Sequence, residues 1–190
     1  MTIPINHRMV LIIGPTTTGK TTLSYKLQKT APISTTIISQ DDVVISVNNQ
    51  KNCGMLVSTA IRKKYSSLLK EAIKKPGELI VLDMLNIRIF DVFETILRIK
   101  RQGYFEKITL LKMNLPFKLH DKFCGQRKTF NVPSMTTEQL FSNMVNQLTW
   151  YQSPSGSLHH TFPFTEEYLI EDPREVEFIY PLISSKQYKK

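Results

Sequence analysis

The sequence predicts a three-layer α/β fold, in which a parallel five-stranded sheet is covered by helices on both faces. Short apolar runs alternate with longer amphipathic segments along most of the 190-residue chain. These runs lack the polar–apolar alternation of half-exposed strands, which favours strands that are buried on both sides. No internal repeat or linker-like segment divides the chain, so we expect residues 1–190 to form a single domain.

Five runs of apolar or β-branched residues are predicted to be the strands of this sheet. The first is the sequence MVLII, the second is the β-branched run TTIIS and the third is LIVLD. Two more follow in the second half of the chain, the last of them close to its end. In order, the predicted strands are residues 9–13, Thr35–Ser39, Leu79–Asp83, residues 107–113 and residues 176–180.

Five helices are predicted between the strands from their apolar periodicity and their end signals. The first ends before Pro32, because the residue that precedes a proline disfavours helical backbone. The second ends at the sequence KKPG (residues 74–77), where lysines suit the negative helix end and proline cannot continue it. Thr136 and Gln139 form a capping box that opens the last helix. The predicted helices are residues 21–29, 55–75, Ile89–Gln102, 117–124 and 136–150.

Composition excludes several classes of protein. The apolar share of 41% and the charged share of 22% are those of a folded chain and exclude a disordered one. No run of 18 apolar residues is present, and residues 1–13 lack the features of a signal peptide, so no membrane association is expected. Cys53 and Cys124 lie far apart without metal-binding spacing, which favours reduced thiols in a cytoplasmic protein.

The net charge of +9 is concentrated in two segments. Residues 51–75 contain seven basic residues and one acidic residue, and residues 98–128 contain nine basic and two acidic residues. Residues 129–185 have the opposite balance, with one basic and seven acidic residues. Such concentration favours a polyanionic partner, a nucleotide or a nucleic acid, over an evenly solvated basic surface.

Residues 14–21 (GPTTTGKT) match the phosphate-binding loop pattern in full, between a predicted strand and a predicted helix. The glycines at its ends allow a tight turn that points backbone N–H groups at phosphate oxygens, at the positive end of the helix. Lys20 can reach the β- and γ-phosphates, and the Thr21 hydroxyl can bind Mg²⁺. The motif therefore predicts a P-loop NTPase fold with ATP and Mg²⁺ as cofactors. The predicted nucleotide contacts are Gly14, Thr16, Thr17, Thr18, Gly19, Lys20, Thr21 and Thr22.

Acidic residues follow two of the predicted strands. Asp83 ends the LIVLD strand, which is the Walker B pattern for a carboxylate that holds Mg²⁺. Asp41 and Asp42 follow the second strand. Because ligands of open α/β sheets bind beyond the carboxyl ends of the strands, these side chains should gather near the loop. We expect one of the pair, with a slight preference for Asp41, to accept the proton of an acceptor hydroxyl, and the other to cap a helix.

The order of these motifs resembles small P-loop kinases, in particular the group of polynucleotide 5′-kinases, zeta-toxin-like kinases and chloramphenicol phosphotransferase-like enzymes. The similarity spans about residues 10–127 and includes the segment IVLDMLN (residues 80–86), in which Asn86 fits a polar position of that group. The resemblance implies ATP-dependent transfer of the γ-phosphoryl group to a hydroxyl. The acceptor would be a nucleic-acid end, a nucleoside or another small molecule.

The same resemblance implies a lid that closes over the phosphates, here at about residues 117–136. Arg127 fits a lid arginine that stabilises charge in the transition state. Lys122 stands where a second arginine is expected, and lysine lacks the bidentate fork of arginine. The candidate catalytic residues are therefore Lys20, Asp41, Asp42 and Arg127.

Two alternatives use the same loop differently. The sequence GPTTTGKT is also similar to the loop of isopentenyl transferases, which bind a prenyl diphosphate and act on adenine. Those enzymes have Asp-Ser where this chain has Asp41 and Asp42, and they are longer. The second alternative is a non-catalytic nucleotide-binding module. The sequence contains no Asn-Lys-x-Asp motif, which argues against a guanine-nucleotide switch.

Overall fold

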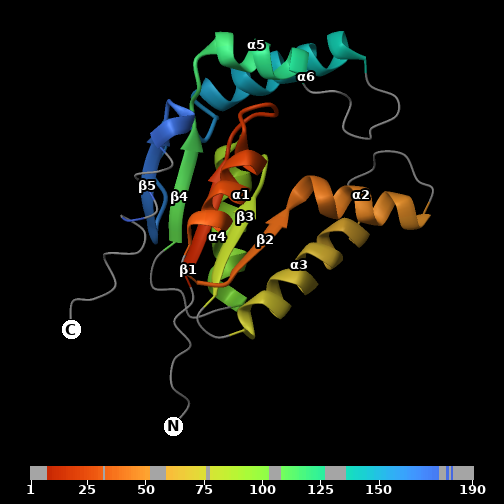
Figure 1. Ribbon diagram of the computed structural model, residues 1–190, viewed down its shortest axis with the longest axis vertical. Helices are drawn as coiled ribbons and strands as arrows, with labels where there is room; N and C mark the ends of the chain where they lie inside the picture. Colours follow the sequence, from red (N-terminus) through yellow and green to blue (C-terminus); the bar gives the residue numbers. More distant parts are fainter. Residues whose placement is uncertain are drawn as a thin grey trace.

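The computed structural model describes residues 8–31, 33–51, 59–75, 78–102, 108–126 and 136–175, together with Ile179 and Pro181. Strands and helices alternate along most of the chain (Figure 1). In order they are β1 (Arg8–Ile13), α1 (Lys20–Thr30), β2 (Thr35–Ser39), α2 (Gln40–Lys51), α3 (Thr59–Ile73), β3 (Leu79–Asp83), α4 (Ile89–Gln102), β4 (Ile108–Met113), α5 (Phe117–Gln126), α6 (Thr137–Gln152), β5 (Thr165–Ile170) and the short 3₁₀ helix η1 (Pro173–Glu175).

The five strands form one parallel sheet in the order β2-β3-β1-β4-β5, which confirms the predicted fold class. β1 lies at the centre, and Leu11 is paired with Leu82 of β3 and Leu110 of β4. Because the central strand has neighbours on both edges and helices on both faces, its four residues from Val10 to Ile13 have no exposed surface. This burial explains why β1 is a continuous apolar run.

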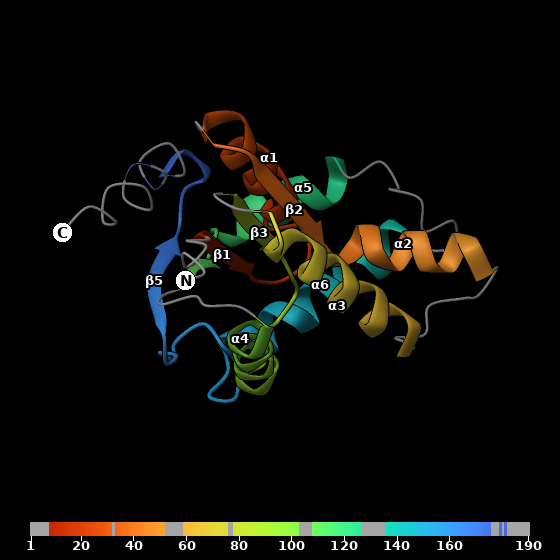
Figure 2. The same cartoon turned by 90° about the horizontal axis from the view of Figure 1, so that it is seen from below.

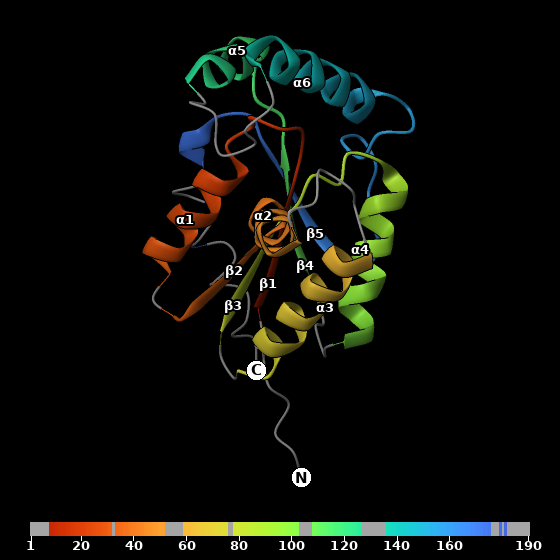
Figure 3. The same cartoon turned by 90° about the vertical axis from the view of Figure 1, so that its right-hand side faces the viewer.

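Helices cover both faces of the sheet. α1 lies on one face, and α3 and α4 lie on the other, as seen from below and from the side (Figures 2 and 3). Alternate β1 side chains separate into the two cores: Leu11 and Ile13 pack with α3 and α4, and Val10 and Ile12 pack with α1. The apolar residues of a single strand therefore supply both cores.

α5 and α6 cross above the carboxyl ends of the strands, on top of the sheet (Figures 1 and 3). α6 opens with the predicted capping box, in which the Thr136 hydroxyl accepts from the Gln139 N–H and the Gln139 side chain accepts from the Thr136 N–H. Tyr151, near the other end of α6, is fully buried in the core on the α4 side of the sheet. Within the described residues, no helix is both long enough and apolar enough to cross a lipid bilayer.

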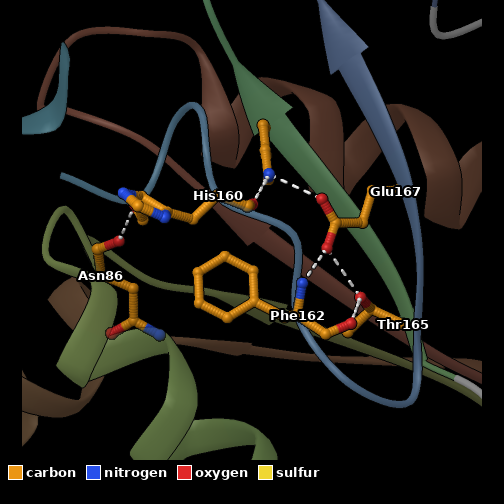
Figure 4. A network of polar contacts seen from close by, with 7 residues as sticks. Asn86, His160, Phe162, Thr165 and Glu167 are labelled. Atoms are coloured by element: carbon orange, nitrogen blue, oxygen red, sulfur yellow. Dashed lines mark hydrogen bonds and ion pairs between the residues drawn. The ribbon is translucent and has the colours of Figure 1, made fainter. Parts of the chain in front are cut away.

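The fifth strand lies earlier in the chain than predicted, at Thr165–Ile170. Of the predicted range 176–180, only Ile179 falls within the described residues, and its backbone is helical. β5 was not predicted at these positions because it contains two adjacent glutamates, and glutamate is depleted in strands. One of them, Glu167, forms an ion pair of 2.6 Å with the buried Lys112 of β4, and Figure 4 shows that it also accepts from the N–H of Phe162.

The other predicted elements agree with the structure apart from their ends, with one omission. The predicted helix at residues 55–75 is α3, which begins at Thr59 after the undescribed residues 52–58. α2 was not predicted, because its sequence QDDVVISVNNQK has little helical periodicity. In Figure 1, α2 and α3 lie side by side beyond β2.

Candidate active site

The phosphate-binding loop is built by backbone turns that its glycines permit. Gly14 has φ +146°, and a Cβ placed there would lie 2.9 Å from Cβ of Met113 in β4, so only glycine fits. Gly19 has φ +79° and directs the chain into α1, whose first turn has no side-chain cap. Thr17 is also in the left-handed region, with φ 61°. The loop thus leads into the N-terminus of α1, and the first N–H groups of a helix generally favour an anion.

Three side chains of the loop bond to carbonyl groups of the loop itself. The Lys20 ammonium donates to the Pro15 carbonyl (2.6 Å), and the buried Thr18 hydroxyl donates to the same oxygen (3.0 Å). The Thr17 hydroxyl donates to the Thr16 carbonyl (2.7 Å), and Thr22 is exposed. The threonine hydroxyls therefore shape the loop, and phosphate contacts from them stay a prediction.

Thr21 and Asp83 meet at the centre of the site. The Thr21 hydroxyl donates to Oδ2 of Asp83 at 2.6 Å, which joins the end of the loop to the carboxyl end of β3. Asp83 is only 4% exposed. Burial raises the pKa of the Asp83 carboxyl, and the Lys20 charge and the Thr21 hydrogen bond oppose this rise. A hydroxyl and a carboxylate in contact are suitable ligands for Mg²⁺ alongside phosphate oxygens.

Asp41 and Asp42 lie in the first turn of α2, and both are exposed. Each raises the pKa of Asp83 through its negative charge, and the effect of Asp41 is the larger of the two. The expectation that one of them caps a helix is wrong, because the Ser39 hydroxyl accepts from the Asp42 N–H (3.5 Å) at the start of α2. Both carboxylates therefore remain candidates for contact with an acceptor.

No cluster of three or more histidine, cysteine, aspartate or glutamate side chains is positioned to hold a metal within the described part of the chain. Thr21 and Asp83 would instead share Mg²⁺ with the phosphates of a nucleotide. This arrangement suits Mg²⁺, which usually keeps several waters and takes only one or two carboxylates from the protein.

Asn86 does not reach the site, although the sequence places it in a polar position of the resembled group. Its side chain is buried, and its amide donates to the Thr95 hydroxyl of α4 at 3.0 Å. Its carbonyl accepts from the Ser157 hydroxyl (2.8 Å), and its φ of 38° turns the chain after β3. Asn86 therefore fixes the loop between β3 and α4. Of the predicted lid residues, Lys122 is exposed and Arg127 lies outside the described residues.

The structure brings further polar side chains to the site that the sequence did not indicate as functional. The Gln40 side chain accepts from the Leu85 N–H (3.1 Å), which ties α2 to the segment after Asp83. The Gln147 side chain of α6 accepts from the Thr16 N–H of the loop at 2.7 Å. Neither glutamine belongs to a recognisable motif, so no sequence signal separates them from surface glutamines.

His120 of α5 is buried near the loop, and neither ring nitrogen has a hydrogen-bond partner within the described residues. Burial lowers the pKa of His120, and the Lys20 charge lowers it further, while the nearby Leu115 backbone acts in the opposite direction. The folded protein therefore binds a proton at His120 less readily than the unfolded chain does. Because the unfolded chain gains this proton more readily, the folded protein should lose stability as the pH falls below the usual histidine pKa of about 6.5.

We expect this titration to appear in the thermal stability of the protein. Relative to His120→Leu, wild type should lose up to about 1 kcal/mol of unfolding free energy per pH unit between pH 6.5 and 5.5. Thermal unfolding of both proteins at several pH values measures the difference. Parallel curves for the two proteins would show that His120 is not held neutral by the fold.

No family model matches the sequence, and no curated protein matches it significantly. Solved structures match over nearly the whole chain. Shikimate kinase from Acinetobacter baumannii in complex with shikimate has a TM-score of 0.58 and 15% identity, covering 97% of this chain and 97% of that chain. APS kinase CysC from Mycobacterium tuberculosis in complex with AMPPNP and APS has a TM-score of 0.58 and 12% identity, covering 96% and 98%. Kti12 from Chaetomium thermophilum in complex with ADP-AlF3 has a TM-score of 0.58 and 16% identity, covering 93% and 97%.

At these levels of identity the likeness concerns the fold. The comparisons do not show the narrower group of polynucleotide 5′-kinases, zeta-toxin-like kinases and chloramphenicol phosphotransferase-like enzymes, and the resemblance to that group stays a prediction. The five-stranded parallel sheet with flanking helices matches the kinase-like α/β fold of P-loop NTPases. The chain has the P-loop kinase fold.

Proposed function

We propose that the protein is an ATP-dependent kinase that transfers the γ-phosphoryl group to a hydroxyl of a small molecule. The observation that carries this proposal is the 2.6 Å hydrogen bond between Thr21 and Asp83. It brings the last residue of the phosphate-binding loop and the carboxylate of the neighbouring strand to one point, where the two side chains would hold Mg²⁺ beside the phosphates of a bound nucleotide. The nucleotide-bound structures of APS kinase and Kti12 share this fold.

In this proposal each residue of the site has a distinct task. The N–H groups at the start of α1 bind the inner phosphates, and Lys20 moves from the Pro15 carbonyl to the β- and γ-phosphates. Thr21 and Asp83 would hold Mg²⁺, which would supply positive charge next to the transferred group. Asp41 or Asp42 accepts the proton of the acceptor hydroxyl, and Arg127 closes over the phosphates from the lid.

Small hydroxyl acceptors are favoured by the comparisons, which include structures bound to shikimate and to APS. The concentration of positive charge in residues 51–75 and 98–128 favours an acceptor that is itself anionic. A phosphorylated or carboxylated small molecule satisfies both observations. A nucleic-acid end is the second candidate, and its binding should fall steeply with salt because several counterions are released.

The proposal is tested by incubating the protein with γ-labelled ATP, Mg²⁺ and a panel of acceptors. The panel contains small hydroxy acids, sugars, nucleosides and 5′-hydroxyl oligonucleotides. Labelled product from one acceptor class identifies the substrate class. A parallel incubation with dimethylallyl diphosphate and AMP or tRNA tests prenyl transfer. Tight ATP binding without product from any acceptor would instead indicate a non-catalytic nucleotide-binding module.

The exposed carboxylates of α2 provide a specific test of the acceptor side. If Asp41 is the general base, Asp41→Asn should lower turnover about 10²- to 10⁴-fold without weakening ATP binding, because the amide cannot accept the proton. Asp42→Asn is the matched control on the next residue and should have a smaller effect. Turnover with the identified acceptor and ATP titration by calorimetry measure the two quantities. Normal turnover in both variants would exclude a base in α2.

A further inference from the structure

Gln147 makes a contact that joins two distant parts of the chain. Its Oε1 accepts from the backbone N–H of Thr16, the third residue of the phosphate-binding loop, at 2.7 Å. The side chain comes from α6, which crosses above the carboxyl ends of the strands (Figure 3). An N–H group of the loop is thus already bonded to a protein side chain rather than directed only at a ligand.

The position of Gln147 is fixed by the packing of α6. Met144 and Tyr151, three residues before it and four residues after it, lie on the same side of the helix and are both fully buried. The half-buried Gln147 therefore projects from a helix face that is held against the protein body. A side chain on such a helix is placed more accurately than one on a loop.

The remaining atoms of the amide group lie beside the phosphate-binding loop. In a planar amide the nitrogen lies about 2.3 Å from the oxygen. When Oε1 accepts from Thr16, the two N–H donors of Nε2 are therefore also beside the loop. Lys20, four residues after Thr16, already supplies the cationic contact from within the loop. Nε2 would add neutral donors from α6 to the outermost phosphate, without taking part in proton transfer.

We propose that Gln147 is a positioning residue for the terminal phosphoryl group of the nucleotide. Oε1 holds the Thr16 amide, and Nε2 donates to the γ-phosphate, so that the site distinguishes nucleoside triphosphate from diphosphate. This inference rests on the proposed function, because it requires a nucleotide in the loop. It adds a residue from α6 that no loop motif contains.

The substitution Gln147→Glu separates the two halves of the amide group. Glutamate keeps an oxygen that accepts from Thr16 but replaces the donor with a negative charge next to the γ-phosphate. Binding of AMPPNP and of ADP, each with Mg²⁺ at pH 8, is measured by calorimetry in wild type and variant. We expect the preference for AMPPNP over ADP to fall about tenfold or more, because like charges at this distance repel strongly in a partly buried site.

Gln152→Glu is the matched control, because it makes the same change at an exposed position at the end of α6. Its preference for AMPPNP over ADP should equal that of wild type. Gln147→Ala removes the donor without adding charge, and its preference should fall about threefold to tenfold. If thermal unfolding shows that Gln147→Glu does not fold, Gln147→Ala provides the test in its place.

The outcomes that overturn the inference differ from those that overturn the proposed function. If wild type binds AMPPNP and Gln147→Glu or Gln147→Ala keeps the same preference over ADP, the contact only attaches α6 to the loop. Tighter AMPPNP binding by Gln147→Ala would show that the glutamine obstructs the site. If wild type binds neither nucleotide, the proposed kinase function itself fails, and the inference fails with it.

Discussion

Replacing Lys20 with alanine is expected to lower turnover about thousandfold or more while leaving the fold intact. Lys20 is the first residue of α1, and its ammonium lies against the Pro15 carbonyl of the loop at 2.6 Å. In the proposed kinase reaction this charge would move to the β- and γ-phosphates and stabilise the negative charge that develops during transfer. Removing one such preorganised donor costs about 10²- to 10³-fold in enzymes that stabilise an oxyanion, and a full charge contributes more.

Lys29→Ala provides the control for this experiment, because Lys29 is an exposed lysine in the last turn of the same helix. Its turnover should remain within a factor of two of wild type. Circular dichroism and thermal unfolding of both variants establish that α1 is still folded. Wild-type turnover in Lys20→Ala would contradict the role of the loop in phosphoryl transfer, even if nucleotide binding remained.

Replacing Asp83 with asparagine is expected to abolish Mg²⁺-dependent activity and, at the same time, to stabilise the nucleotide-free protein. Asparagine can still accept the Thr21 hydrogen bond but lacks the negative charge that would hold the proposed Mg²⁺. In the nucleotide-free protein, burial raises the pKa of Asp83, so its ionised form is disfavoured by the fold. Removing a disfavoured charge from a functional site stabilises proteins by about 1 kcal/mol.

The pH dependence of this stabilisation has a defined sign. Because the folded pKa of Asp83 is raised, the folded state binds this proton more tightly than the unfolded state. Wild type therefore loses stability as the pH rises through the folded pKa, whereas Asp83→Asn does not. The difference in unfolding free energy should be largest at neutral pH and should vanish below about pH 3.8.

Glu71→Gln is a suitable control for Asp83→Asn, because Glu71 is an exposed acid on α3 that accepts a hydrogen bond from the Ser67 hydroxyl at 3.1 Å. It should change neither Mg²⁺ dependence nor the pH profile of stability. Thermal unfolding from pH 3 to 8 and Mg²⁺ titration of nucleotide binding give the two measurements. An Asp83→Asn protein with undiminished Mg²⁺-dependent activity would remove this residue from the metal site.

Local sequence patterns predicted the sheet because its inner strands are buried by their own apolar residues. β1, β3 and β4 need no partner to identify them, since burial on both faces demands apolar side chains. β2 lies at the edge of the sheet and is identified by its β-branched residues. β5 is different, because its Glu167 is compatible with a strand only when Lys112 of the neighbouring strand neutralises it. That compensation lies in the tertiary structure, and the sequence alone placed the fifth strand too late.

The candidate site also has one part that could be predicted from the sequence and another that only the structure shows. The loop of residues 14–21, Asp41, Asp42 and Asp83 could be predicted from the sequence, because strand–loop–helix order places strand ends at one edge of a sheet. The structure decided how these groups meet: it joined Thr21 to Asp83, buried Asn86 against Thr95 and brought Gln147 of α6 to the loop. Such contacts depend on packing between elements far apart in the chain, which local hydrophobic patterns and backbone propensities do not encode.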